Sequence, residues 1–287
     1  MTAPVLISGL ASLAGAYDAL LCDIWGVIHN GREHFPQACA ALAAFREENG
    51  PVVLISNSPR PREGVVEQLD ALGVPRSAWS AIVTSGDVTR ELLRARAPGP
   101  AWAIGPDRDA PLYEGLGLQF AGPAEAAFIS CTGPVDDEVE SPEDYRKAFE
   151  IARARDLEMI CANPDLVVQR GDRLIYCGGA LAKLYEEMGG AVSMAGKPFT
   201  PIYDSAIAEV RRLCPADLED PLVLCIGDGA PTDIRGANVH GLDVLFVANG
   251  IHGADAATGG PLNPRTIRDL LAQDGAMATY AIAELTW

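Results

Sequence analysis

Acidic side chains end two apolar runs that lie far apart in this sequence of 287 residues. Asp23 closes the run ALLCD, and Asp228 closes LVLCIGD, with Asp233 five residues later in GDGAPTD. Taken singly, Asp23 could be a turn former, and Asp233 an N-cap or first-turn residue of a helix. Held together, three carboxylates would repel one another, and a hard divalent cation with oxygen ligands relieves that repulsion. The three acids therefore predict a Mg²⁺ site if the fold makes them neighbours.

Two further stretches carry groups that suit a phosphate. VVLISNSPRP places Ser56 and Asn57 after an apolar run, where hydroxyl, amide and backbone N–H groups can donate hydrogen bonds. AGKPFTP places Lys197 in a short loop ahead of a helix whose expected N-cap is Thr200. Each stretch alone is weak evidence. Their order along the chain is the informative feature: acid, Ser/Asn, lysine, then paired acids.

Alternating short apolar runs and longer amphipathic runs must position these side chains. Such alternation predicts βα units around a parallel sheet. Strands are expected at 19–24, 51–56, 221–227 and 242–248, and helices at 35–50, 59–73, 200–213 and 233–240. The carboxyl ends of parallel strands share one edge, where ligands bind. Asp23 and Asp228 are therefore expected to be neighbours despite their separation in sequence.

The middle of the chain carries a second set of α/β signals, including AWAIG, AAFISC and EMICAN. The original rhythm resumes at about residue 191. We predict an α/β protein with a Rossmann-like, doubly wound parallel sheet as its core, formed by residues 1–87 and 191–287. Residues 88–190 are predicted to form an inserted α/β cap domain.

Composition limits the classes of partner and compartment. A formal net charge of −17 disfavours nucleic acid and anionic membranes as partners. No apolar run approaches the roughly 18 residues that cross a bilayer, and the N-terminus lacks the basic start of a secretion signal. Seven cysteines without a CxxC pair favour a reduced, cytoplasmic protein, and four scattered histidines argue against zinc. The sequence does not decide between a monomer and a homo-oligomer.

Four segments together resemble the motifs of haloacid dehalogenase superfamily hydrolases. They are CDIWGVIHNG, LISNS, GKP and IGDGAPTDIRGA, in that order. The resemblance is to the subclass with a large α/β cap (C2 type) after the second motif, which includes NagD-like and p-nitrophenyl phosphatase-like enzymes. Within the middle stretch, CANPD resembles the substrate-facing loop of that subclass, and GGALAKLYEEMGG resembles the helix that returns the chain to the core.

This resemblance implies a role for each acid of the first and fourth motifs. Asp23 would attack phosphorus and form an aspartyl-phosphate. Asp228 would ligate Mg²⁺, with Asp23 and Asp233 completing the carboxylate part of the metal site. The substrate would be a small phosphorylated metabolite.

The remaining motif residues are implied to bind the substrate. Ser56, Asn57 and the catalytic Lys197 would hold the oxygens of the transferring phosphoryl group, together with backbone amides of the first motif. Asn163 and Asp165, from the cap, would help to select the substrate.

Trp25 departs from the pattern of the family. Most phosphatases of the superfamily carry a second Asp at this position, and it serves as general acid and base. Indole has no titratable proton near neutral pH. The resemblance implies that the metal site would be unaffected, because in this superfamily the residue at this position ligates Mg²⁺ through its backbone carbonyl. The loss falls on protonation of the leaving group and activation of water, which a positioned acid or base accelerates about 10²–10⁴-fold.

Three functions remain open on these residues. The first is a Mg²⁺-dependent phosphatase that is slow, prefers good leaving groups, or draws a proton from another group such as His29. The second is a ligand-binding or sensor protein that retains the fold with little chemistry. The third is a metal-free dehalogenase, which the presence of Asp228 disfavours. His29 and His34 are themselves expected to be exposed loop residues.

Overall fold

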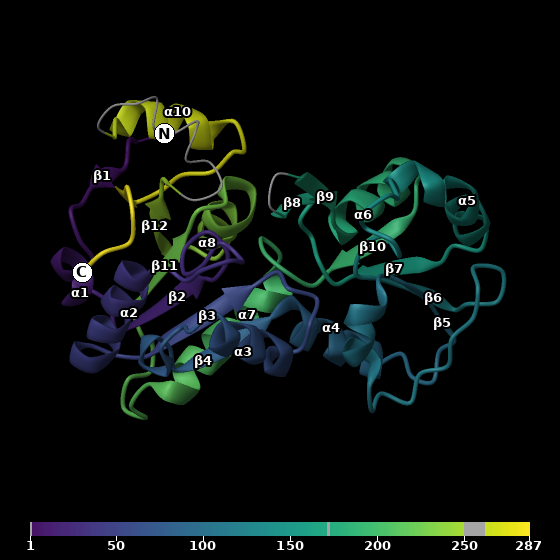
Figure 1. The fold of residues 1–287 in the computed structure, drawn as a ribbon, viewed down its shortest axis with the longest axis horizontal. Coiled ribbons are helices and arrows are strands. Elements are labelled where there is room, and N and C mark those ends of the chain that lie inside the picture. Colours follow the sequence, from purple (N-terminus) through teal and green to yellow (C-terminus); the bar gives the residue numbers. More distant parts are fainter. Residues whose placement is uncertain (1, 171–172, 250–261) are drawn as a thin grey trace. The chain divides into compact units, whose positions relative to one another are not determined.

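The computed structural model describes residues 2–170, 173–249 and 262–287. By its internal contacts the chain divides into two compact units (Figure 1). The first unit contains Met1–Ser56, Val66–Val83 and Tyr203–Trp287, and the second contains Asn57–Val65 and Thr84–Ile202. The whole range 88–190 falls in the second unit, and its assignment to an inserted cap stays a prediction.

The first unit is built on a sheet of seven strands among the described residues. Their spatial order is β1 (Val5–Leu6), β13 (Tyr280–Ile282), β12 (Asp243–Val247), β11 (Val223–Gly227), β2 (Ala19–Asp23), β3 (Val52–Ser56) and β4 (Ala81–Thr84). The strand pairs from β1 to β3 are parallel. All residues of β2 and β11 are buried, as expected of continuous apolar strands covered on both faces. The predicted α/β class with a parallel core sheet is confirmed.

The chain changes direction across the sheet between β2 and β11. From β2 it moves outward through β3 to β4, whereas from β11 it moves outward the other way through β12 to β13. The register pairs Ile226 of β11 with Cys22 of β2, so the two strands end side by side. Ligand sites of open α/β sheets lie at such a switch point, outside the carboxyl ends of the strands.

Helices and helical turns connect these strands. They are α1 (Ala11–Ala14), α2 (Pro36–Glu48), α3 (Arg62–Ala71), η1 (Arg76–Ala78), α7 (Thr200–Leu213), η4 (Ala230–Ile234), α8 (Arg235–Val239) and α10 (Pro264–Ala272). One expected helix signal acts differently from the prediction, because Thr200 is the first residue of α7 rather than its N-cap. Gly50 follows the C-cap Asn49, and a Cβ there would lie 2.0 Å from the Asp18 carbonyl oxygen, so close backbone packing explains this glycine.

The second unit has its own parallel sheet. Its strands run in the order β10 (Ala191–Met194), β7 (Glu158–Cys161), β6 (Phe128–Cys131) and β5 (Ala101–Ile104). An antiparallel hairpin, β8 (Val167–Arg170) and β9 (Arg173–Tyr176), lies outside this sheet. The helical elements are α4 (Ser85–Arg94), η2 (Asp107–Tyr113), η3 (Pro142–Tyr145), α5 (Arg146–Ala154) and α6 (Gly178–Glu187). Phe149 and Tyr185, fully buried, pack against each other in its core.

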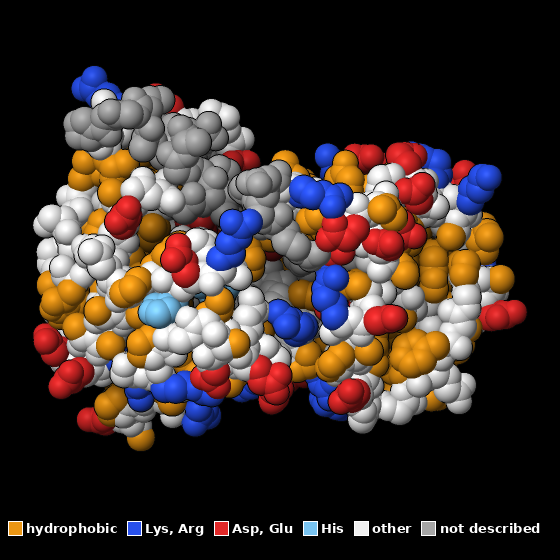
Figure 2. Space-filling view, in the orientation of Figure 1, with side chains coloured by type: hydrophobic (Ala, Val, Ile, Leu, Met, Phe, Trp, Pro, Cys, Tyr) orange, Lys and Arg blue, Asp and Glu red, His pale blue; other side chains and the backbone are white. Residues whose placement is uncertain are grey.

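On the face shown in Figure 2, acidic and basic side chains are interspersed. None of the described helices combines the length and apolar character that a membrane span requires.

Candidate active site

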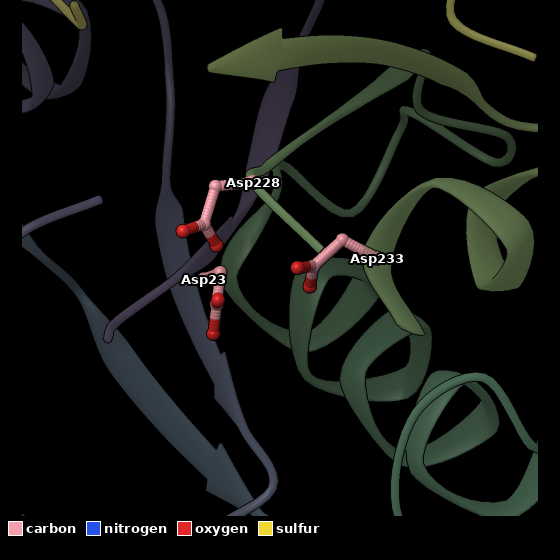
Figure 3. Close-up of side chains that lie close together, drawn as sticks. All are labelled: Asp23, Asp228 and Asp233. Atoms are coloured by element: carbon pink, nitrogen blue, oxygen red, sulfur yellow. The ribbon is translucent and has the colours of Figure 1, made fainter. Parts of the chain in front are cut away.

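Three carboxylates meet at the switch point of the first sheet. Asp23 is the last residue of β2, Asp228 follows β11, and Asp233 lies in the helical turn η4. One oxygen from each lies within 4.8 Å of the other two, and all three side chains are buried. Figure 3 shows the three side chains grouped together, with the carboxylate of Asp233 directed toward the other two. The expected juxtaposition of Asp23 and Asp228 is confirmed, while the roles of these residues stay predictions.

Such a cluster fits a hard divalent cation. Two carboxylates about 4 Å apart repel by about 4 kcal/mol at the effective dielectric constant of 20 that suits protein sites. Oxygen ligands at this spacing are the donors that Mg²⁺ accepts, usually together with water and substrate phosphate.

The backbone after Asp23 approaches the cluster very closely. Gly26 has φ +86°, and a Cβ built on it would lie 2.1 Å from Oδ2 of Asp228. Its N–H donates to the carbonyl oxygen of His29 at 2.8 Å, which folds the loop back on itself. Only glycine accepts this backbone conformation and this contact without strain. The first motif therefore positions Asp228 as well as supplying Asp23.

Asp233 is fixed by the turn that precedes it. The N–H of Gly229 donates to its Oδ2 at 3.0 Å. A Cβ on Gly227 would lie 2.3 Å from the Cβ of Asp233, so the end of β11 must be glycine for η4 to pack there. Among the described residues η4 is the π-helical segment, with a proline at its start. Such single turns recur at functional sites.

Metal binding by this cluster gives a first prediction. We expect Mg²⁺ at a concentration of 100 times Kd to stabilise the wild-type protein by about 2.7 kcal/mol, and Asp228→Asn to abolish that gain. In EDTA the variant should be at least as stable as the wild type, because one repelling charge is removed. Thermal melts with and without Mg²⁺ measure both effects. Asp217→Asn, an exposed acid of the same unit, is the matched control, and an equal Mg²⁺ shift in both variants would contradict the metal site.

Ser56 lies beside the carboxylates in the first unit. It is the last residue of β3, and the register pairs the preceding Ile55 with Asp23. Its hydroxyl and the backbone that follows therefore leave the sheet at the edge that carries Asp23.

In the second unit, Asn57 connects two of the predicted substrate loops. Its side-chain Oδ1 accepts from the N–H of Lys197 at 2.7 Å, while its Nδ2 donates to the Lys197 carbonyl at 3.2 Å and to Oδ1 of Asp165 at 2.9 Å. Asn57 and Lys197 are buried, at 7% and 3% exposure. The side chain of Asn57 thus links the loop of Lys197 to the loop of Asp165, and we call these three hydrogen bonds the Asn57 bracket. A role in binding phosphoryl oxygens would fall to the backbone N–H of Asn57.

The bracket depends on a glycine. A Cβ on Gly196 would lie 2.5 Å from Oδ1 of Asn57 and 2.8 Å from Cδ of Pro164. The loop after β7 is ordered by its own Asx turn, in which Oδ1 of Asn163 accepts from the N–H of Asp165 at 3.1 Å. The structure therefore gathers Asn57, Asn163, Asp165 and Lys197 in one part of the second unit.

Trp25 packs within its own loop. Its ring makes an edge contact with His29, with centroids 5.2 Å apart and planes at 77°. A Cβ on Gly31 would lie 2.3 Å from Cη2 of the indole, so the ring rests directly on that glycine. The indole stabilises the turn of the first motif and contributes no titratable group.

The expectation that both loop histidines are exposed is wrong. His29 is 2% exposed, and His34 is half-buried with Nδ1 2.8 Å from the carbonyl oxygen of Leu72. Nδ1 of His29 accepts from the N–H of Gly31 at 3.0 Å, so the neutral ring carries its proton on Nε2. Burial lowers the pKa of His29 to about 4. An imidazole that is neutral at pH 7 with so low a pKa is poorly suited to replace the missing acid.

The lowered pKa of His29 gives a second prediction. Between pH 6.5 and about 4 the unfolded chain binds a proton at His29 that the folded chain does not bind, so the free energy of unfolding falls as the pH falls. The loss amounts to about 3 kcal/mol across that window. In His29→Asn, whose Oδ1 can keep the bond from Gly31, this part of the slope should vanish. Urea unfolding in EDTA from pH 7 to pH 4 measures it, and identical slopes would contradict the assignment.

Two parts of the chain match models of known protein families. A family model described as haloacid dehalogenase-like hydrolase matches residues 20–119, and another, HAD-hydrolase-like, matches residues 194–273. These ranges contain Asp23 and Ser56 in the first case, and Lys197, Asp228 and Asp233 in the second.

Individual relatives agree with the family models. The crystal structure of a haloacid dehalogenase-like hydrolase from Brucella suis 1330 is 43% identical, covers 98% of this chain and 100% of its own, and superposes with a TM-score of 0.83. The 5′-nucleotidase YutF of Bacillus subtilis is 23% identical over 94% of this chain and 96% of its own length. The D-glycerol 3-phosphate phosphatase of Mycobacterium tuberculosis is 28% identical over 90% of this chain and 70% of its own length.

Proposed function

This chain belongs to the haloacid dehalogenase-like hydrolase family, and from that premise we propose that it is a Mg²⁺-dependent phosphatase. Two relatives are named as a 5′-nucleotidase and a D-glycerol 3-phosphate phosphatase. The enzyme class is accordingly a phosphoric monoester hydrolase, and the substrate is a small phosphorylated metabolite. The observation that carries the proposal is the set of three buried carboxylates within 4.8 Å.

Asp23 is the nucleophile of the proposed reaction. A carboxylate oxygen of Asp23 attacks phosphorus, the ester bond to the alcohol breaks, and an aspartyl-phosphate forms. Water then attacks the same phosphorus and regenerates the carboxylate with release of phosphate. Bound Mg²⁺, held by Asp23, Asp228, Asp233 and the Trp25 backbone carbonyl, would neutralise charge on the transferring group.

The other motif residues complete this assignment. Ser56 and the backbone N–H of Asn57 donate to phosphoryl oxygens, and Lys197 supplies positive charge. Bracketing by the Asn57 side chain supports such a role, because a buried lysine held at its backbone N–H and carbonyl loses little further freedom on binding. Asn163 and Asp165 face the alcohol part of the substrate.

The test is phosphate release from a panel of phosphomonoesters, with Mg²⁺ and with EDTA. The proposal expects turnover that requires the metal and is fastest with p-nitrophenyl phosphate, whose leaving group hardly needs a proton. Two other outcomes would overturn it. Ligand binding without turnover would indicate a sensor protein, and halide release from a haloacid in EDTA would indicate a dehalogenase.

A further inference from the structure

A cavity of about 280 Å³ opens in the second unit where β5 and β6 end. Its walls include Gly105, Asp109, Ala110, Tyr113, Phe120 and Thr132. Gly105 directly follows β5, and Thr132 directly follows β6. The other four lie in η2 or, in the case of Phe120, in the segment that follows it. None of them belongs to the motifs that the sequence assigns to the reaction.

Asp109 is the buried acid of this cavity, and the exposed Asp107 also lines it. It is 5% exposed, in a helical turn fixed by the bond from its N–H to the carbonyl of Pro106 at 2.9 Å. Burial raises the pKa of this carboxyl, and the Thr132 hydroxyl and the Arg108 guanidinium oppose the rise. Arg108 itself pairs with Asp137. Arg60 also opposes the rise, so the charged carboxylate is partly compensated by the protein and can still accept a hydrogen bond from a ligand in the cavity.

The other walls are a hydroxyl and two aromatic rings. Thr132 is 3% exposed, and its hydroxyl interacts with the Asp109 carboxyl. A Cβ on Gly105 would lie 1.9 Å from Oγ1 of Thr132, so glycine is needed to leave that oxygen in place. The rings of Tyr113 and Phe120 meet edge to face, with centroids 5.3 Å apart.

This cavity shares a sheet edge with the predicted substrate loops. One backbone hydrogen bond joins each pair of neighbouring strands at their carboxyl ends. The N–H of Thr132 donates to the Ile104 carbonyl at 2.8 Å, between β6 and β5, and the N–H of Ala162 donates to the Cys131 carbonyl at 2.8 Å, between β7 and β6. The N–H of Ala195 donates to the Cys161 carbonyl at 3.1 Å, between β10 and β7. The Asn163 loop begins after Ala162, and Lys197 follows Ala195 by two residues. Because neighbouring strands lie about 4.8 Å apart, the three steps from β10 to β5 span about 14 Å.

We propose that the cavity binds the end of the leaving group farthest from phosphorus, and that Asp109 selects substrates carrying an ammonium or hydroxyl group at that end. This inference rests on the proposed phosphatase function. A carboxylate accepts hydrogen bonds from such donors and repels an anion. The aromatic rings also favour a cationic end. Asp109 is thus a specificity residue, and Thr132 adds a second hydrogen-bonding group.

Three aryl phosphates test this selection. They carry a 2-aminoethyl, a 2-hydroxyethyl or a carboxymethyl group para to the phosphate ester, so that their phenol leaving groups are chemically similar. p-Nitrophenyl phosphate, which has no donor at that end, is the reference. We expect the wild-type kcat/KM to fall from the amine to the alcohol to the acid, with the amine preferred over the acid by at least about tenfold.

Two variants separate selection from stability. Asp109→Asn should lower the preference for amine over acid by about tenfold. Glu114→Gln, an exposed acid that follows Tyr113 in the sequence, should leave that preference unchanged. Ala110→Phe, at an exposed position in the cavity wall, adds a large side chain there and should slow all three para-substituted esters.

The outcomes distinguish this inference from the function on which it rests. No Mg²⁺-dependent hydrolysis of any aryl phosphate by the wild type would overturn both. Hydrolysis with the same amine-to-acid preference in the wild type and Asp109→Asn would overturn the inference alone. If Asp109→Asn does not fold, unchanged kinetics of the para-substituted esters in Ala110→Phe would overturn it equally.

Discussion

Asp23→Asn is expected to lower phosphate release by at least about 10³-fold, because the amide retains the shape of the carboxylate but cannot attack phosphorus. Thermal stability in EDTA should match or exceed that of the wild type, since one of three mutually close charges is removed. Steady-state turnover of p-nitrophenyl phosphate and a thermal melt measure the two effects.

The matched control for Asp23→Asn is Asp217→Asn, an exposed acid in the same unit, which should retain full activity. Residual turnover of more than a few per cent in a clean preparation of Asp23→Asn would contradict the covalent mechanism. A loss of both activity and fold would instead reveal a structural role for this buried side chain.

Trp25→Asp is expected to raise kcat/KM for alkyl phosphates by about 10²-fold, and for aryl phosphates much less. An alkoxide needs a proton as it leaves, whereas p-nitrophenolate hardly does, so the wild type should favour aryl esters steeply. The variant places a titratable group where the indole has none. A plot of kcat/KM against the pKa of the leaving alcohol, for both proteins, measures the change, because kcat/KM reports departure of the leaving group and not the later breakdown of the phosphoenzyme.

The matched control for this gain is Trp25→Asn, which makes the same change in size without a proton to transfer. Both variants lose the packing of the indole on His29 and Gly31, so thermal melts must accompany the rates. Equal rates in the Asp and Asn variants, with a flat dependence on leaving group in the wild type, would show that another group supplies the proton.

The carboxylate cluster could be predicted from sequence because every step rests on a local pattern. Continuous apolar runs marked β2 and β11 as buried parallel strands, and the edge rule then placed Asp23 beside Asp228. Asp233 follows because a short turn must return the chain to a helix. Little long-range information was needed beyond the parallel arrangement of the strands.

The Asn57 bracket could not be predicted in this way. Its partners lie 108 and 140 residues away in sequence, and no local spacing encodes such contacts. The burial of His29 was also missed, because HNG after an apolar run reads as an exposed turn. Bonds from Gly26 and Gly31 to His29 fold that turn inward. Gly26 and Gly196 lie against Asp228 and Asn57, and nothing in the sequence around these glycines indicates those contacts.

The phosphoenzyme is the most direct test of the account. If Asp23 attacks phosphorus and no base at position 25 activates water, the aspartyl-phosphate should break down slowly and accumulate. Mixing the wild-type protein with p-nitrophenyl phosphate and Mg²⁺ should give a burst of p-nitrophenol of about one equivalent per site. Acid quenching should then yield a peptide phosphorylated on Asp23, absent in EDTA. Steady turnover with no phosphorylated peptide, or with the phosphoryl group on another residue, would contradict the account.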